Sequence, residues 1–460
     1  MSTLIAISGL GIICLILEIL NLRKILIPVT VILLAGILGM TISEYHLGKS
    51  FFEFEHYNMI VNTSYSQGFS CLFIILAIFI IIMSPKFYED NIVKIADYIS
   101  LKIFMLAGAV AMVSFGNLAM FFIGLEVLSI VVYVLASSNI KDVRSNEAGL
   151  KYFIMGAFAS SFVLFGIALI YGAIGSFDID NIYTAALTGT LPVWFNIGFM
   201  MVIVGLLFKA STFPFHFWAP DVYEGSPTLT TAMMSTLVKV AAIGTLFKMV
   251  SIMPGGMTPA FQMIILILSI LTMTVANITG LRQKNIKRMM AYSGISHAGF
   301  MMMTLLAINS ASNTVLYYAA AYSFAGIAAF AVILIVCQGK DNEDISNFHG
   351  LFRRQPMLAT ILSLAMLSMG GIPVLAGFFA KLFVFEQMLQ TNHVVLVIFG
   401  VINSIIAVYY YIGIINAMLE KNDGETVFRV PISYRLVALC AIVFNLILGI
   451  FPSIIMNLSL

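Results

Sequence analysis

Charged residues are scarce in this sequence. They make up 10% of its 460 residues, whereas a soluble domain carries about 25%. Hydrophobic residues reach 61% and the mean hydropathy is +1.04. Because no soluble fold has enough interior to hide that much apolar surface, the composition excludes a soluble globular protein. It predicts an all-α protein that crosses a membrane many times. The net charge of +2 gives no reason to expect a nucleic acid as partner.

Motifs for cofactors and metals are also missing. The four cysteines, Cys14, Cys71, Cys337 and Cys440, lie in apolar segments without a CxxC pair or a histidine at metal spacing. The sequence contains no GxGxxG after a strand and no histidine pair suited to haem. We therefore expect no cofactor and no metal in this chain.

The long apolar runs predict about fourteen membrane-spanning helices. The first run lacks a basic leader and a cleavage site, so we interpret it as a span and not as a signal peptide. The predicted spans are 4–22, 25–42, 67–84, 99–115, 117–136, 150–175, 194–217, 228–252, 259–281, 289–309, 313–338, 356–390, 394–419 and 433–456.

Basic residues test this count, because lysine and arginine are retained on the cytoplasmic side. With these spans, eighteen of the 23 fall on one side, and only Lys49 and Lys248 fall on the other. A miscounted helix would scramble this asymmetry. We therefore predict a multi-pass membrane protein with both termini outside the cytoplasm.

Four charged residues lie well inside the predicted spans: Glu126, Lys209, Lys239 and Lys381. Each costs about 2.5–3.5 kcal/mol at a helix centre unless it faces a partner or a wet cavity. Glu126, Lys209 and Lys239 share one predicted depth. Burial disfavours a charged lysine and a nearby carboxylate favours it, so movement of Glu126 relative to Lys209 would switch proton binding. The alternative is a static Glu126–Lys209 ion pair that fixes helix packing.

Helix breakers lie beside two of these lysines. Pro214 follows Lys209 by five residues, and a second group precedes Lys381: Gly370, Gly371 and Pro373. Proline removes a backbone donor, so we expect spans 7 and 12 to be discontinuous and to line wet cavities. Ordinary packing kinks remain an alternative.

The charged residues recur in the same order in the two halves. Glu126 on span five and Lys209 on span seven are echoed by His297 on span ten and Lys381 on span twelve. An offset of five spans inverts the topology, which predicts two inverted five-helix repeats. The predicted parts are 1–98 (helices 1–3), 99–255 (helices 4–8), 256–422 (helices 9–13) and 423–460 (helix 14). His216 and His297 are further candidate relay groups, although either could be a satisfied hydrogen-bonding residue.

Several motifs resemble one known family. FKASTFPFHFWAPDVYEGSPTLTTAMMSTLVKVA (208–241), NIKRMMAYSGISHAGFMMM (285–303), GLFRRQPMLA (350–359) and LSMGGIPVLAGFFAKLFVF (367–385) are similar to the N subunits of proton-pumping NADH-quinone oxidoreductases, the respiratory complex I. The resemblance runs from about span four to span thirteen.

The resemblance implies an antiporter-like subunit with broken helices 7 and 12. It implies that Glu126, Lys209, Lys239 and Lys381 form a charged axis for protons. It also implies partners: sister antiporter-like subunits, small membrane subunits, and a peripheral arm that carries flavin and iron–sulfur clusters. Quinone reduction, of ubiquinone or menaquinone, would take place in those partners. The alternative function is a subunit of a multisubunit cation/proton antiporter without redox chemistry; the VYEG sequence of the loop argues against it.

Overall fold

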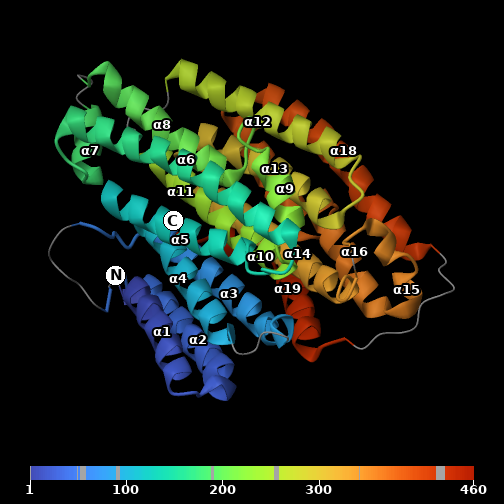
Figure 1. The fold of residues 1–460 in the computed structure, drawn as a ribbon. Coiled ribbons are helices and arrows are strands. Elements are labelled where there is room, and N and C mark those ends of the chain that lie inside the picture. The colour runs from blue at the N-terminus through green and yellow to red at the C-terminus, as the bar shows by residue number, and fades with distance from the viewer. Residues whose placement is uncertain are drawn as a thin grey trace. The chain divides into compact units, whose positions relative to one another are not determined.

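The computed structural model is built from helices joined by loops, without a β-sheet among its described residues (Figure 1). It describes residues 2–48, 50–51, 58–89, 94–187, 191–252, 258–340, 342–420 and 430–459. Lys49, Lys421 and Arg429, three of the basic residues used to predict orientation, lie outside these ranges. The all-α class predicted from composition is confirmed.

The chain divides into two compact units. Unit 1 contains residues 1–210, 237–261 and 459–460, and unit 2 contains residues 211–236 and 262–458. The chain thus leaves unit 1 at the predicted break in span seven and returns to it within span eight. These two units are defined by how the helices pack. The four predicted parts are defined by chain order and helix orientation, so the units do not test them and the four-part division stays a prediction.

Unit 1 is formed by nine described helices. Their bounds are α1 (Ser2–Ile19), α2 (Arg23–Leu47), α3 (Ser64–Phe87), α4 (Ile95–Ser114), α5 (Leu118–Ala136), α6 (Val143–Ile174), α7 (Ile179–Leu187), α8 (Val193–Ala210) and α11 (Lys239–Ser251). Helices α1 to α4 lie side by side, and α6 packs along α8 (Figure 1).

Unit 2 begins with the short helices that follow the break. Its helices are α9 (Trp218–Gly225), α10 (Thr228–Met233), α12 (Pro259–Gly280), α13 (Ile286–Met303), α14 (Ser312–Val336), α15 (Leu351–Arg354), α16 (Pro356–Gly370), α17 (Ala376–Gln390), α18 (Val394–Leu419), α19 (Ile432–Ile450) and α20 (Ser453–Met456). Single turns η3 (Thr304–Ala307) and η4 (Ile345–Phe348) join them, and the π-helical turn η2 (Met234–Val238) leads back to unit 1.

Twelve of the described helical segments are long and apolar enough to cross a membrane, counting α10, η2 and α11 as one segment. Two other segments, α13 and the pair α16–α17, are too polar or too short to be counted among them. Helix α13 is 18 residues long but carries Lys287, Arg288 and His297, and α16 and α17 are only 15 residues each. The predicted span 194–217 is too long, because α8 ends at Ala210. The predicted span 150–175 is too short, because its helix begins at Val143.

Both predicted breaks are present. Helix α8 ends at Ala210, where Ser211 has a φ of 60° and the Phe213–Pro214 peptide bond is cis. Helix α16 ends at Gly370, where Gly371 has a φ of 87°. Glycine adopts this left-handed conformation without a steric cost, so it ends the half-helix cleanly.

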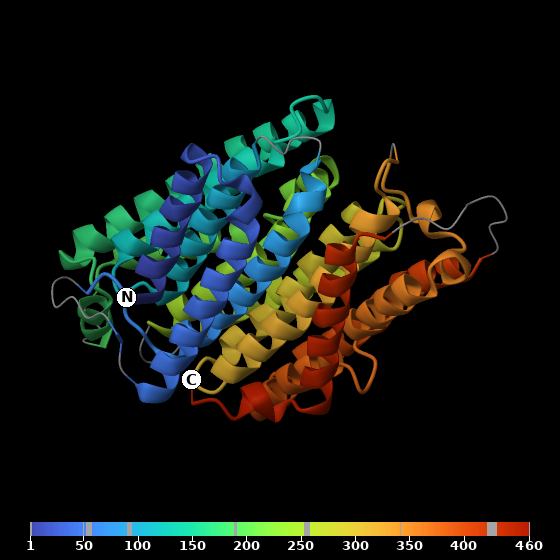
Figure 2. The same ribbon diagram turned by 90° about the horizontal axis from the view of Figure 1, so that it is seen from below.

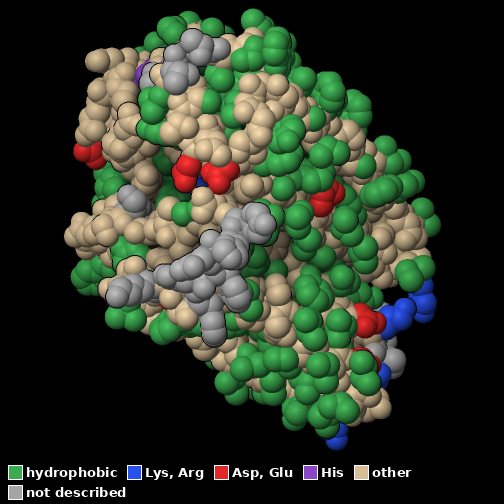
Figure 3. Space-filling view, turned by 90° about the vertical axis from the view of Figure 1, so that its left-hand side faces the viewer, with side chains coloured by type: hydrophobic (Ala, Val, Ile, Leu, Met, Phe, Trp, Pro, Cys, Tyr) green, Lys and Arg blue, Asp and Glu red, His purple; other side chains and the backbone are tan. Residues whose placement is uncertain are grey.

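Apolar side chains cover much of the face drawn in Figure 3, where charged side chains gather in a few small groups. Most spans expose an apolar stripe, as expected where lipid or another subunit covers a helix. Helix α14 differs, because all of its residues from Thr314 to Val336 are buried within the molecule. It lies beside α19 in unit 2 (Figure 2).

Candidate functional site

Lys209 lies at the broken end of α8, in unit 1. The sequence predicted it in mid-span, whereas it is the second-last residue of its helix. Its side chain is buried, and its Nζ donates a hydrogen bond of 2.6 Å to Ser129 Oγ on α5. The rings of Tyr133 and Tyr152 lie 5.3 Å and 5.0 Å from Nζ. A hydroxyl acceptor, two aromatic faces and the carbonyl end of a helix all favour the protonated lysine.

Glu126 lies on α5, one helical turn before Ser129. It occupies the middle of that helix, as predicted, and its Oε1 is buried without a hydrogen-bond partner. The carboxylate interacts electrostatically with Lys209, but no ion pair joins the two residues among the described side chains. The static ion pair considered from the sequence is therefore absent from this structure. The two groups lie close enough to interact electrostatically, although Lys209 is bound to Ser129 and Glu126 Oε1 has no hydrogen-bond partner.

Glu126 also faces outward. On α5 it lies between Ile123 and Ile130, which are 49% and 55% exposed, and it is itself only partly buried. A lone carboxylate facing lipid at mid-helix is costly, so this position fits a helix face that another protein chain covers.

A small cavity adjoins Lys209 in unit 1. Its volume is about 10 Å³, the room of about one water molecule. Ser129, Tyr133, Ser160 and Lys209 supply its polar lining, and apolar residues of α5, α6 and α8 supply the rest. The predicted cavity beside Lys209 is present, although it is small.

Lys381 lies in unit 2, in the second turn of α17. Its Nζ donates a hydrogen bond of 2.9 Å to the carbonyl of Gly370, at the end of α16. The ring of Phe300 on α13 lies 5.1 Å from Nζ. Pro373 occupies the loop between the two half-helices. The lysine thus reaches back across the break to the negative end of the preceding half-helix, which favours a positive charge.

His297 lies in the same unit and is held by two tyrosines. Its Nδ1 is 2.8 Å from the hydroxyl of Tyr318, and its Nε2 is 3.3 Å from the hydroxyl of Tyr411. A neutral imidazole has one donor and one acceptor, so one tyrosine donates to the ring while the other accepts. This geometry suits a group that takes up a proton on one side and releases one on the other.

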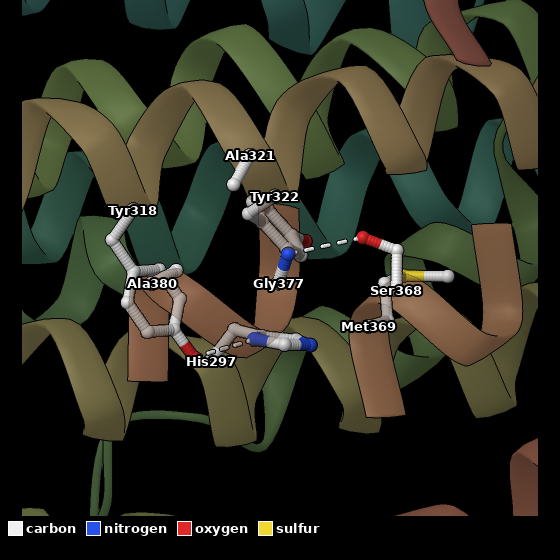
Figure 4. Close-up of a pocket in the computed structure, with 8 residues that line it drawn as sticks. All are labelled: His297, Tyr318, Ala321, Tyr322, Ser368, Met369, Gly377 and Ala380. Carbon is white, nitrogen blue, oxygen red and sulfur yellow. Dashed lines mark hydrogen bonds between the residues drawn. The ribbon is translucent and has the colours of Figure 1, made fainter. Parts of the chain in front are cut away.

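A second small cavity lies beside His297 (Figure 4). Its volume is also about 10 Å³. Figure 4 shows the imidazole below the cavity, Tyr318 and Tyr322 on α14 beside it, and Ser368 on α16 next to Gly377 on α17. Each unit therefore has a water-sized cavity next to its titratable residues.

The remaining two candidates, Lys239 and His216, are both buried. Lys239 is 1% exposed and begins α11, directly after the π-helical turn η2. Such turns recur at functional sites. His216 lies in the break after α8, 4% exposed, with the ring of Phe217 4.3 Å away.

Sequence reasoning missed several partners of the candidate residues. Ser129 and Tyr133 stand three and seven residues after Glu126. Helical spacing puts both on the same face of the helix as Glu126, and this was the signal available in the sequence. Lys102 was counted with the loops, but it is 2% exposed inside α4 and its Nζ donates to Ser84 Oγ at 2.7 Å. Its position eight residues into an apolar helix was the available signal.

The described residues contain no group of three or more His, Cys, Asp or Glu side chains that could hold a metal. The four cysteines are free.

Comparisons with known proteins agree with one another. Residues 116–407 match the family model described as NADH:quinone oxidoreductase/Mrp antiporter, TM. An NADH-quinone oxidoreductase subunit N from Flavobacterium johnsoniae is 54% identical over the full length of both chains. The subunit N from Cytophaga hutchinsonii is 37% identical, again over the full length of both.

Two solved structures have the same fold. A chain of respiratory complex I from Thermus thermophilus superposes with a TM-score of 0.84 at 30% identity, covering 99% of this chain and 98% of that one. A chain of the Mrp complex from Dietzia sp. superposes with a TM-score of 0.87, covering 100% and 96%. At 18% identity the second match shows the fold alone. With full-length relatives at 54% identity, the chain belongs to the family of N subunits of NADH-quinone oxidoreductase.

Proposed function

We propose that protons cross this subunit along a relay of Glu126, Lys209, Lys239, His297 and Lys381, with His216 beside the first break. Quinone reduction elsewhere in the complex would drive the relay by shifting charge at its end. The chain supplies no redox group in this account. Its residues bind, hold and release protons.

One observation carries the proposal: Lys209 is bound to Ser129 while Glu126 lies one turn away without a hydrogen bond. An ammonium locked to a carboxylate would stay charged. An ammonium bound to a neutral hydroxyl is stabilised further by the nearby carboxylate, so a charge change at Glu126 alters the proton affinity of Lys209. The relay can therefore be switched by charge without a large movement.

The outward position of Glu126 supports a driving signal that arrives from a neighbouring subunit. Glu126 lies between exposed residues on one face of α5, where an adjacent chain could add or remove charge near the carboxylate. Binding to sister antiporter-like subunits and to small membrane subunits fits this face. A peripheral arm with flavin and iron–sulfur clusters would complete the complex.

The membrane topology proposed from the sequence has similar support. If α13 and the broken pair α16–α17 each cross the membrane, the twelve apolar spans become the predicted fourteen. A broken helix with a lysine at the break occurs once in each half, as two inverted repeats require. This topology places both termini outside the cytoplasm.

The alternative is a cation/proton antiporter subunit without redox chemistry. It is supported by the likeness of fold to the Mrp chain, at 18% identity. The full-length identity of 54% with N subunits favours the redox-driven complex. Purification from membranes separates the two, because only the first predicts iron–sulfur subunits in the same particle.

Membrane vesicles test the relay. We expect Glu126→Gln, Lys209→Met, Lys239→Met and Lys381→Met, introduced one at a time, to preserve assembly and to lower donor-driven acidification. Wild-type acidification in all four assembled variants would contradict the proposal.

A further inference from the structure

Helix α19 is tied to the break that precedes Lys381. Asn445 of α19 is fully buried and bonds in two directions. Its Oδ1 accepts a hydrogen bond of 2.8 Å from Ser368 Oγ on α16, and its Nδ2 donates one of 2.9 Å to the carbonyl of Ala321 on α14. A single amide side chain therefore links three helices of unit 2.

Ser368 extends this link across the break. Its hydroxyl also accepts a hydrogen bond of 3.2 Å from the backbone N–H of Gly377, in the first turn of α17 (Figure 4). Gly377 lies four residues before Lys381, on the same helical face. The path from Asn445 to Gly377, one helical turn before Lys381, thus contains only two hydrogen bonds.

The backbone of α19 also lies directly against the loop between α16 and α17. Gly449 lies one turn beyond Asn445, and a Cβ at Gly449 would lie 2.2 Å from the carbonyl oxygen of Val374. Only glycine fits there without moving the loop between the half-helices. Tyr317 of α14 donates a hydrogen bond of 2.8 Å to the carbonyl of Leu448, which fixes α19 along α14.

We propose that Asn445 is a positioning residue for the relay: through Ser368 it fixes the break so that Lys381 stays on the Gly370 carbonyl beside the His297 cavity. This inference rests on the proposed function of Lys381. The cavity has room for about one water, so a displacement of α17 by a fraction of a water diameter closes it or opens it further. Asn445 lies outside residues 116–407, which the family model matches.

Three variants test the inference in the assembled complex. Asn445→Leu removes both hydrogen bonds. Asn445→Asp keeps the shape, and when protonated it still accepts from Ser368 and donates to Ala321; as pH rises and the carboxyl ionises, it loses its donor. Asn313→Leu is the control, because Asn313 ties α14 to the carbonyls of Met456 and Leu458 without touching the break.

The readout is the number of protons moved per quinone reduced, measured in vesicles at about pH 6 and about pH 9, a range that spans the titration of a buried carboxyl. We expect at least a twofold lower ratio in Asn445→Leu at both pH values and a wild-type ratio in Asn313→Leu. In Asn445→Asp we expect a wild-type ratio at the lower pH and a fall at the higher pH. A wild-type ratio in Asn445→Asp at both values, beside a lowered ratio in Asn445→Leu, also supports the inference.

Two results would overturn it. One is an assembled Asn445→Leu complex with the wild-type ratio. The other is an Asn445→Asp complex in which the number of protons moved per quinone reduced falls equally at both pH values. This second result overturns the inference even if Asn445→Leu fails to assemble. Lys381→Met separates this inference from the proposed function. If Lys381→Met pumps normally, the relay fails; if it does not pump while Asn445→Leu does, only the positioning role fails.

Discussion

Lys381 reaches back from α17 to donate a hydrogen bond of 2.9 Å to the carbonyl of Gly370, the last residue of α16. Lys209 is the second-last residue of α8. Lys209 thus lies in the last turn of the half-helix before its break, whereas Lys381 follows its break and bonds the last carbonyl of the half-helix before it. The carbonyl end of a helix stabilises positive charge by about 0.3–1 kcal/mol at exposed sites and by up to about 2 kcal/mol when partly buried.

Lys381→Met tests the second of these sites. Methionine keeps most of the side-chain length but cannot hold a proton, so we expect proton transfer through this unit to slow by about 100-fold or more. Acidification of vesicles and the rate of quinone reduction should be measured together. Assembly should survive, because the change removes a buried charge. Acidification within about 20% of wild type would be incompatible with a relay through Lys381.

Ser129→Ala tests the hydroxyl that accepts from Lys209. A hydrogen bond to a charged group is worth about 1.5–3 kcal/mol, so its loss disfavours the protonated lysine. Each 1.36 kcal/mol corresponds to one pH unit. We therefore expect the alkaline limb of the pumping profile to move by about one to two units toward lower pH. Ser161→Ala on exposed α6, whose hydroxyl bonds only its own helix, is the matched control and should leave the profile in place.

Gly156→Ala tests the placement of Tyr133. A Cβ at Gly156 would lie 2.0 Å from the Tyr133 hydroxyl oxygen, so the ring must move and its contact with Lys209 changes. We expect a fall of about twofold to tenfold in pumping, in line with a loss of about 0.5–1 kcal/mol or more in cation–π stabilisation. Gly172→Ala, on the same helix with nothing within 4 Å of its Cβ position, should pump normally. Equal effects at the two glycines would argue against the tyrosine.

Arg288→Gln tests the link between α9 and α13. Arg288 Nη1 lies 2.7 Å from Asp221 Oδ1 and 2.9 Å from Glu224 Oε2. Because these side chains are about one-third exposed, we expect a loss of only about 0.5–1 kcal/mol, measured as a lower melting temperature of the complex at low salt. High salt should reduce the difference. Arg144→Gln, at a more exposed contact of 3.6 Å, should change the melting temperature less.

Much of the fold could be predicted because a bilayer imposes length and polarity on each span. The broken helices could be predicted because Pro214, Gly370, Gly371 and Pro373 interrupt apolar runs beside charge. The end of α8 at Ala210 could not be predicted, since aromatic residues recur up to Phe217 and only the backbone geometry shows where the helix stops.

The charged residues of the candidate site could be predicted from the sequence, but the neutral residues that bind them could not. A charge inside a span is conspicuous by its cost, whereas Ser129, Tyr318 and Tyr411 resemble the many hydroxyls that bond within membrane helices. Asn445 was equally hidden, because its role depends on helices α14 and α16, which are distant from it in the chain. The roles assigned to Glu126 and the three lysines stay predictions.

The central claim is that Glu126 and Lys209 act as one coupled unit, and a double-variant cycle on the protons moved per quinone reduced tests it most directly. Glu126→Gln and Lys209→Met should each lower the ratio, and the two together should lower it no further than the worse of them. Losses that multiply, as for independent sites, would contradict the account.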